Sequence, residues 1–211
     1  MWSNSESEPE PYWFASLPLG LRSSAKLYSD FAEGLNYICK ANGAADDTVY
    51  YLDDILTLGP SQQACKESLD IILKCSKECG FGIRQEKTVQ PCRSIEYLGI
   101  TIDSQNKVLK VSNEKVEDMQ SELQEWLNRK SCTKRQVLSL LGKLTFYAQV
   151  VKYGHMFKRR LIEASKSASK LNDRIKMDEE MRKDIKWWYS SIKLFNVISW
   201  YPREFDASSA V

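Results

Sequence analysis

The chain has 211 residues, 43% of them hydrophobic and 27% charged, and a formal net charge of +2. This composition is ordinary for a soluble globular protein, and no apolar run approaches the length needed to cross a bilayer. Because the first eleven residues carry three glutamates and no base, a signal peptide is not expected. We therefore expect a cytosolic or nuclear protein that is neither secreted nor bound to a membrane.

The N-terminal segment is predicted to lead into a long helix. Residues 1–11 are polar and acidic, which predicts disorder, and residues 12–17 are typical of a short strand or extended segment. A helix is predicted from Ser24 to the turn signal Asn42-Gly43. Four apolar side chains share one face of this helix, at steps of four, four and three residues: Leu27, Phe31, Leu35 and Ile38.

Two acidic residues separate the first two predicted strands. Residues 48–52 and 55–58 are rich in β-branched, aromatic and aliphatic side chains, as strands are. Only Asp53-Asp54 lies between them, so the pattern predicts a tight hairpin with two carboxylates at its tip.

A helix, a second hairpin and a series of helices are predicted to follow. Ser61 caps the helix, which ends before Gly80, and residues 95–102 and 107–111 are predicted to pair. From there on the apolar period is helical. Four helices are predicted there, around residues 116–127, 133–148 (with a Thr133/Gln136 capping box), 155–170 and 178–195. This order predicts an α+β domain followed by a helical one.

The adjacent carboxylates indicate a metal site. Ionising both is costly, because the two charges are close together and partly removed from water. A divalent cation offsets that cost, and hard oxygen ligands suit Mg²⁺. With a third carboxylate, two ions would bridge a triphosphate and a 3′-hydroxyl, activating the attacking oxygen and stabilising the leaving pyrophosphate. The alternative is that Asp53 and Asp54 are ordinary turn residues on a solvated loop.

Positive charge is concentrated in the C-terminal half. Between Arg129 and Lys176 there are 13 lysines and arginines against only Glu163 and Asp173, a local net charge of +11. Such a block suits a phosphate backbone, because each basic contact releases condensed counterions. The alternative is a solvated helical face.

Two motifs in the N-terminal half resemble those of reverse transcriptases. These enzymes carry Tyr-x-Asp-Asp on a hairpin of the palm, and this chain has that string at residues 51–54. They also carry an upstream block of the form Leu-Pro-x-Gly-x-x-x-Ser-Pro-x-x-Phe. Residues 17–28 are similar to this block, with Ala25 in place of the proline and Tyr28 in place of the phenylalanine.

Later segments follow in the order of the family's palm and thumb. Glu86-Lys87-Thr88 and Tyr97-Leu98-Gly99-Ile100 look like later palm blocks. Residues 133–151, with Leu-Leu-Gly-Lys-Leu at 140–144, are similar to the thumb of retroelement enzymes, especially the tyrosine-recombinase retrotransposon type. The resemblance implies an α+β fold, in which a partial polymerase palm is followed by an all-helical thumb and connection. The expected boundaries are a disordered N-terminus at 1–11, partial palm at 12–111, thumb at 112–176, and connection helix with tail at 177–211.

The resemblance also implies roles for single residues. Asp53 would bind catalytic metal, Asp54 would be a weaker or indirect ligand, and Lys87 would protonate the leaving pyrophosphate as a general acid. A complete enzyme would use two Mg²⁺ ions, a dNTP, and an RNA or DNA template with a primer. Contacts with the nucleotide or template are expected from Gly20, Arg22 and Tyr51, and contacts with the primer from Tyr97, Leu98 and Gly99. The nucleic-acid backbone is expected to contact six cations: Lys134, Arg135, Lys143, Lys158, Arg159 and Arg160. The plainer alternatives are a turn glycine at 20, a surface arginine at 22, a strand aromatic at 51, a solvated lysine at 87 and a core leucine at 98.

One expected catalytic residue is missing. Family members place their first catalytic aspartate on a palm strand upstream of the Leu-Pro-x-Gly block, but the sixteen residues before Leu17 contain no aspartate. We therefore expect a fragment of an RNA-directed DNA polymerase with little or no activity alone. The main alternative is a non-catalytic nucleic-acid-binding protein derived from a retroelement, and a less favoured one is another palm-type nucleotidyl transferase. No oligomeric state is predicted.

Overall fold

The computed structural model describes residues 16–18 and 20–199. The chain divides into two compact units, unit 1 (Met1–Cys92) and unit 2 (Arg93–Val211). The predictions for residues 1–11, for most of 12–17 and for the C-terminal tail lie outside the described residues.

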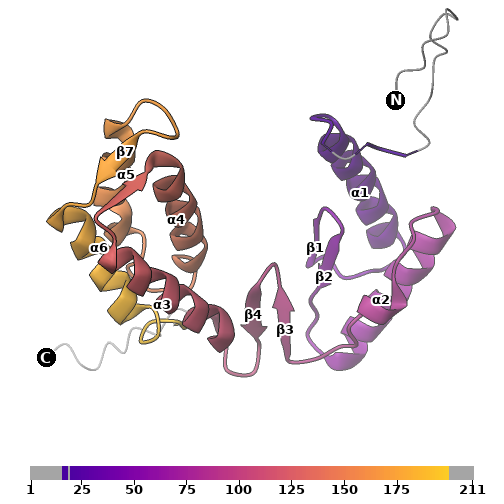
Figure 1. Ribbon diagram of the computed structural model, residues 1–211. Coiled ribbons are helices and arrows are strands. Elements are labelled where there is room, and N and C mark those ends of the chain that lie inside the picture. The colour runs from indigo at the N-terminus through magenta and orange to yellow at the C-terminus, as the bar shows by residue number, and fades with distance from the viewer. Residues whose placement is uncertain (1–15, 19, 200–211) are drawn as a thin grey trace, which may run out of the picture. The chain divides into compact units, whose positions relative to one another are not determined.

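Unit 1 places a β-hairpin against two helices (Figure 1). Its elements are α1 (Ser24–Ala41), β1 (Thr48–Tyr51), β2 (Asp54–Thr57), α2 (Gln62–Glu78) and the 3₁₀ turn η1 (Gln85–Lys87). The predicted cap of α2 is confirmed, since the Ser61 hydroxyl accepts a hydrogen bond from the Ala64 amide at 3.1 Å. Gly80 follows the helix with φ +79°, a conformation that suits a residue without a Cβ.

The core of unit 1 is small and lies between the two helices and the hairpin. Its buried members are Leu35, Cys39, Ala44, Ile72 and Cys75. Tyr50 and Ile55, which face each other across the hairpin, pack against this cluster from the inner face of the two strands.

The apolar stripe predicted on α1 is mostly exposed. Leu35 is buried as expected, but Leu27, Phe31 and Ile38 are 42%, 64% and 40% exposed. The helix instead packs through the neighbouring line of residues that includes Ala32 and Leu35. Unit 1 therefore carries an apolar face that no described residue covers.

Unit 2 begins with an antiparallel sheet. Its strands are β3 (Ser94–Tyr97), β4 (Ile100–Asp103), β5 (Val108–Lys110) and β8 (Ile198–Ser199), in the order β3-β4-β5-β8. The strand predicted over residues 95–102 is wrong as one piece, because a two-residue turn at Leu98-Gly99 divides it. Positive φ angles at both turn residues, 50° and 83°, reverse the chain there.

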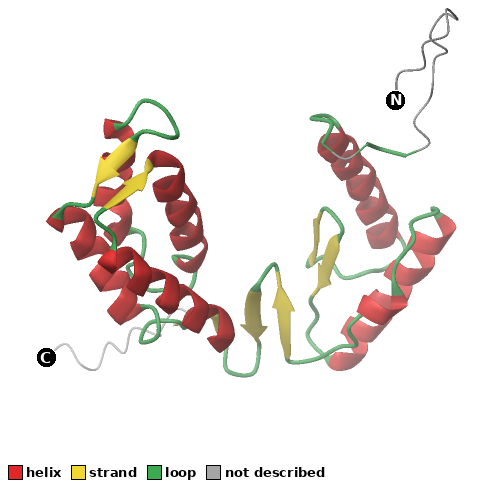
Figure 2. Ribbon diagram, in the orientation of Figure 1, coloured by secondary structure: helices red, strands yellow, loops and turns green. Residues whose placement is uncertain are grey.

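The rest of unit 2 is a helical bundle (Figure 2). It contains α3 (Asn113–Asn128), α4 (Lys134–Tyr147), the 3₁₀ turn η2 (Met156–Lys158), α5 (Arg159–Ser167) and α6 (Glu179–Ser191). The predicted capping box is confirmed: the Thr133 side chain accepts from the Gln136 amide, and the Gln136 side chain accepts from the Thr133 amide. The largest side chains of its core are Leu123, Trp126, Leu140, Leu144, Leu161, Met181, Ile185 and Trp188, none more than 2% exposed.

Two short strands lie among these helices. β6 (Ser131–Thr133) pairs antiparallel with β7 (Arg174–Lys176). Helical periodicity gave no sign of them, because three-residue strands are too short to show an alternating pattern. The mixed helix-and-strand class is nevertheless confirmed. Within residues 16–18 and 20–199, no helix combines the length and apolar character that a membrane crossing requires.

Gly154 gives a test of this packing. A Cβ at this position would lie 2.6 Å from the Trp188 ring, and Trp188 is fully buried. We expect Gly154→Ala to lower the free energy of unfolding by about 1–3 kcal/mol, as overpacked cores do. Denaturant titration would measure it.

Gly142→Ala is the matched control. Gly142 lies in α4, and no atom lies within 4 Å of an added Cβ. Alanine there should stabilise the helix by roughly 0.5–1 kcal/mol. Equal effects of the two substitutions would contradict the packing described for Trp188.

Candidate active site and nucleic-acid interface

The turn of the β1–β2 hairpin is one residue earlier than predicted. Tyr51 pairs with Asp54, so the turn consists of Leu52 and Asp53, and Asp54 is the first residue of β2. Leu52 has φ 48°, an unfavourable angle for a residue with a branched side chain. Strain of this kind costs about 1–3 kcal/mol and often marks a functional site.

The two carboxylates are on the outside of the hairpin. Asp53, Asp54 and Tyr51 are all exposed, while the next pair inward, Tyr50 and Ile55, faces the core. Asp54 lies on the opposite face of β2 from Ile55, and on its own face only Leu56, farther from the turn, is buried. Both acidic side chains are accessible to a ligand.

Tyr28 of α1 connects the helix to the hairpin. Its ring makes an edge-to-face contact with Phe81, with centroids 6.4 Å apart. Burial raises the pKa of the Tyr28 hydroxyl above its ordinary value of 10.0, and the charge of the nearby Asp53 carboxylate raises it further. Tyr28 of α1 and Asp53 of the hairpin are therefore close together.

The donor chemistry of this turn fits a divalent cation in part. Exposed carboxylate oxygens are the ligands that Mg²⁺ prefers. Among the described residues, however, no group of three His, Cys, Asp or Glu side chains is arranged to hold a metal ion. Asp53 and Asp54 fit as two members of a larger set of ligands.

The other predicted residues of unit 1 lie at exposed positions. Gly20 has φ +86° in a turn, where no atom lies within 4 Å of an added Cβ. The side chains of Arg22 and Lys87 are exposed and make no hydrogen bond or ion pair with the described residues. Lys87 ends the 3₁₀ turn η1. No described interaction joins it to Asp53 or Asp54.

The predicted primer-binding residues form the β3–β4 turn of unit 2. Leu98 is 43% exposed, so the expectation of a core leucine is wrong. The positive φ of Leu98 carries its side chain out of the sheet. Gly99 is closely packed, since an added Cβ would lie 3.2 Å from Phe146. The Lys115 ammonium donates to the Gly99 carbonyl at 3.5 Å and pairs with Glu96.

Five of the six predicted backbone-binding cations interact within the protein. Lys134 donates to the Ala168 carbonyl at 2.7 Å, and Lys143 and Arg159 pair with Glu122 and Glu163 at 2.6 and 2.9 Å. Lys158 is buried and donates to the Thr145 hydroxyl at 3.0 Å, and desolvation lowers its pKa. Only Arg135 has an exposed side chain without such a contact in the described structure.

Arg160 neutralises a fully buried carboxylate. Its guanidinium lies 2.7 Å from Asp184, which is 0% exposed, and 2.8 Å from Glu180. The Arg160 amide donates to the other Asp184 oxygen at 3.1 Å. These contacts, the Asp184 hydrogen bond first, raise the arginine pKa, and they give Arg160 a structural role in joining α5 to α6.

Comparisons with known proteins find a similar family, a similar polyprotein and similar folds. Residues 3–102 match the family model described as "Reverse transcriptase (RNA-dependent DNA polymerase)". The similarity to this family lies in the N-terminal part of the chain and spans 100 of its 211 residues.

One relative is a retroelement polyprotein. The chain is 26% identical over 146 residues to the retrovirus-related Pol polyprotein from transposon gypsy of Drosophila melanogaster. The alignment covers 67% of this chain but only 12% of the polyprotein. The chain is therefore homologous to a small part of that protein.

Solved structures of one viral enzyme share the fold. The foamy viral protease-reverse transcriptase bound to double-stranded DNA has a TM-score of 0.63 and 20% identity, covering 84% of this chain and 29% of the viral one. Its complex with an RNA/DNA hybrid has a TM-score of 0.61 and 18% identity, covering 83% and 22%. These matches show that the chain resembles the reverse transcriptase polymerase fold.

The hydroxyl of Tyr28 was not recognised as part of the site from the sequence. The one available signal was the departure from the family block, which has phenylalanine at this position. A phenol in place of a phenyl ring adds a donor, and Asp53 is an acceptor.

The pKa of Tyr28 tests this contact. We expect Asp53→Asn to lower the Tyr28 pKa toward 10.0, because the charge is removed while burial remains. Because the folded state disfavours the ionised phenol, its stability should fall as the pH rises above about 10. NMR titration with ¹³C-labelled tyrosine would follow it. Asp54→Asn is the control, and an equal shift there would argue against a specific Asp53 contact.

The role of Arg160 is testable by thermal unfolding. Arg160→Met leaves the buried Asp184 carboxylate unpaired, so we expect the melting temperature to fall by roughly 5–10 °C. Arg159→Met removes only an exposed pair and should change it by about 1 °C or less. Similar losses in both variants would contradict the structural assignment.

Proposed function

We propose that the chain is a fragment of an RNA-directed DNA polymerase, whose chemistry is nucleotidyl transfer from a dNTP to a primer 3′-hydroxyl. The observation that carries the proposal is the exposed Asp53-Asp54 pair on a strained two-residue turn, within the segment that matches the reverse transcriptase model. A fold likeness alone would not support a reaction.

Asp53 and Asp54 would hold Mg²⁺ in this proposal. When bound, two such ions activate the attacking hydroxyl and neutralise charge on the phosphates. Tyr28 lies near Asp53, whose charge raises the pKa of the phenol. The exposed Lys87 ammonium acts as the general acid for the leaving pyrophosphate.

Other exposed residues would contact the substrates. The open turn at Gly20 lets the nucleotide or template approach the backbone, and Arg22 binds phosphate. Tyr51 lies beside the acidic pair in the hairpin register and packs near the primer terminus. The turn at Tyr97-Leu98-Gly99 holds the primer end.

The source of the fragment is a retroelement in this proposal. Residues 133–151 support the tyrosine-recombinase retrotransposon type, through the Leu-Leu-Gly-Lys-Leu string at 140–144. Palm and thumb assignments follow the same resemblance. The chain acts in the cytosol or nucleus, where its nucleic-acid substrates are.

The isolated chain has little or no polymerase activity. Two carboxylates do not complete a two-metal site, and the described residues offer no third beside them. Purified chain with Mg²⁺, dNTPs and a primed RNA template should therefore give no extension product. Clear primer extension would refute this statement.

Metal binding by the hairpin is the direct test of the site. Mn²⁺, used as a paramagnetic substitute for Mg²⁺, should broaden NMR signals around Asp53 and Asp54 at millimolar concentration. The double substitution Asp53→Asn/Asp54→Asn should abolish the broadening.

Asp46 and Asp47 provide the matched control. They are also adjacent and exposed in unit 1, directly before β1. Asp46→Asn/Asp47→Asn should leave the effect at the hairpin unchanged. Broadening that survives at the hairpin without Asp53 and Asp54 would refute the metal site.

The second candidate is a non-catalytic nucleic-acid-binding protein. Exposed cations of unit 2 without partners in the described structure, together with the incomplete set of carboxylates, favour it. This candidate requires salt-sensitive duplex binding that is unaffected by Asp53→Ala. A Mg²⁺-dependent reaction lost in Asp53→Ala would favour the polymerase instead.

A further inference from the structure

A continuous backbone ladder joins residues 130–135 to residues 171–177 in unit 2. In the sheet, Ser131 pairs with Lys176 and Thr133 with Arg174. Beyond its ends, the Met177 amide donates to the Lys130 carbonyl at 3.1 Å, and the Arg135 amide donates to the Leu171 carbonyl at 2.9 Å. The two segments therefore run side by side over the whole of this length.

The two strands have one buried face and one solvent face. Cys132 and Ile175 are 3% and 7% exposed and belong to the core of unit 2. Arg174 and Lys176, on either side of Ile175, are exposed. Because strand side chains alternate, both cations project from the same outer face.

Further exposed cations flank the two strands along the chain. Lys130 precedes β6, Arg135 follows it, and Lys170 lies in the loop before β7. All three are exposed, and their side chains make no hydrogen bond or ion pair with described residues. We call these five residues the basic ladder: Lys130, Arg135, Lys170, Arg174 and Lys176.

The acidic residues nearest to β7 already have partners. Arg174 and Lys176 line a polar pocket of about 530 Å³ together with Glu163, Asp178 and Glu180. Glu163 pairs with Arg159 at 2.9 Å and Glu180 with Arg160 at 2.8 Å, while Asp178 accepts from the Met181 amide at 2.8 Å. The two ladder cations are therefore left for an external anion.

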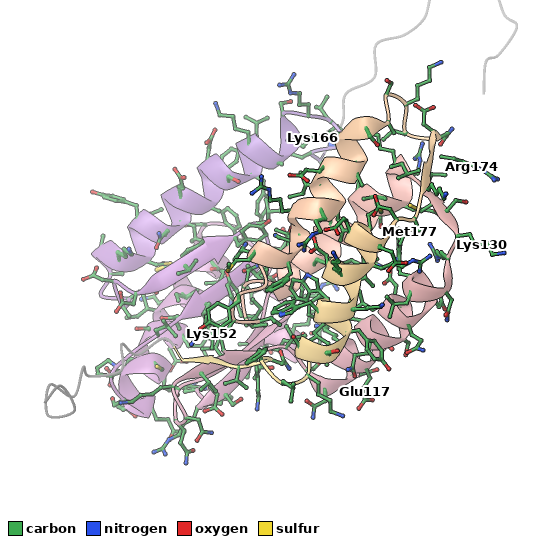
Figure 3. All side chains as sticks on the ribbon, turned by 90° about the vertical axis from the view of Figure 1, so that its left-hand side faces the viewer. Glu117, Lys130, Lys152, Lys166, Arg174 and Met177 are labelled. Carbon is green, nitrogen blue, oxygen red and sulfur yellow. The ribbon has the colours of Figure 1, made fainter. Side chains whose placement is uncertain are left out.

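In Figure 3, two of these residues, Lys130 and Arg174, lie along the right-hand side of the view, and Lys152 lies on the opposite side. We propose that the basic ladder, carried by the outer face of β6–β7, binds the phosphodiester backbone of a nucleic acid. This rests on the proposed function only in requiring a nucleic-acid partner.

The spacing of the charges favours a backbone over a single free phosphate. Cations two residues apart on a strand stand roughly 6–7 Å apart. The basic ladder also includes cations beyond both ends of the two strands. A row of separated, exposed cations matches repeated phosphates and carries no sequence information. The binding should therefore be salt-sensitive and equal for unrelated sequences.

The test measures binding of a fluorescent duplex by anisotropy at several salt concentrations. In Arg174→Gln/Lys176→Gln, affinity at 0.1 M salt should fall roughly tenfold or more, and the slope of log K against log salt should flatten by about 2. Duplex DNA and an RNA/DNA hybrid of unrelated sequences should show the same loss. Thermal unfolding of the variant checks that it still folds.

Lys152→Gln/Lys193→Gln is the control with the same change in net charge. Both lysines are exposed, and they lie near the Val151–Asn196 bridge instead of β7. The control should lose much less affinity and keep the slope of the parent. Equal losses of affinity in both variants would show that only net charge matters and would refute the proposed role of the basic ladder.

The remaining outcomes separate this inference from the proposed function. If the parent binds duplex and the ladder variant binds equally well, the ladder is wrong while nucleic-acid binding stands. If the parent binds neither duplex at a low salt concentration of about 0.05 M, both the role of the basic ladder and the proposed nucleic-acid partner are refuted.

Discussion

The candidate active site depends on one constraint, the pairing register of β1 with β2. Because Tyr50 and Ile55 face each other and pack inward, the next pair, Tyr51 and Asp54, must face outward. A slip of one residue in β2 would exchange the faces of Asp54 and Ile55 and turn Asp54 toward the cluster that Ile55 contacts. The small core of unit 1 therefore determines where the acidic residues stand, and the strained turn at Leu52 is the local consequence.

In unit 2, charge is divided between holding the bundle together and facing solvent. Arg160 pairs with a buried carboxylate, and Lys158 is buried and donates to the Thr145 hydroxyl, so both cations have partners inside the bundle. Arg174 and Lys176 have none in the described structure. The local net charge is therefore larger than the charge available to a nucleic acid. Some of the cations without partners are on or beside the strands β6 and β7.

Much of the fold could be predicted from local patterns. The caps at Ser61 and Thr133 and the stop at Gly80 were visible because each is a contact within one turn of helix. The exposed stripe of α1 was not, because burial depends on what packs against a helix. Likewise, the choice of paired and unpaired cations depends on contacts between residues far apart in the chain, such as Arg160 with Asp184. Of the candidate site, the acidic pair was predictable from its neighbours, whereas the Tyr28 contact required the fold.

The uncovered face of α1 has a practical consequence for any work in solution. Leu27, Phe31 and Ile38 are exposed apolar side chains on a helix whose buried residues are Ala32, Leu35 and Cys39. Surface of this kind associates with itself or with detergent and dyes in proportion to concentration. Self-association of the folded chain, rather than unfolding, should limit the concentration at which it stays in solution. A non-ionic detergent should raise this limit without unfolding either unit.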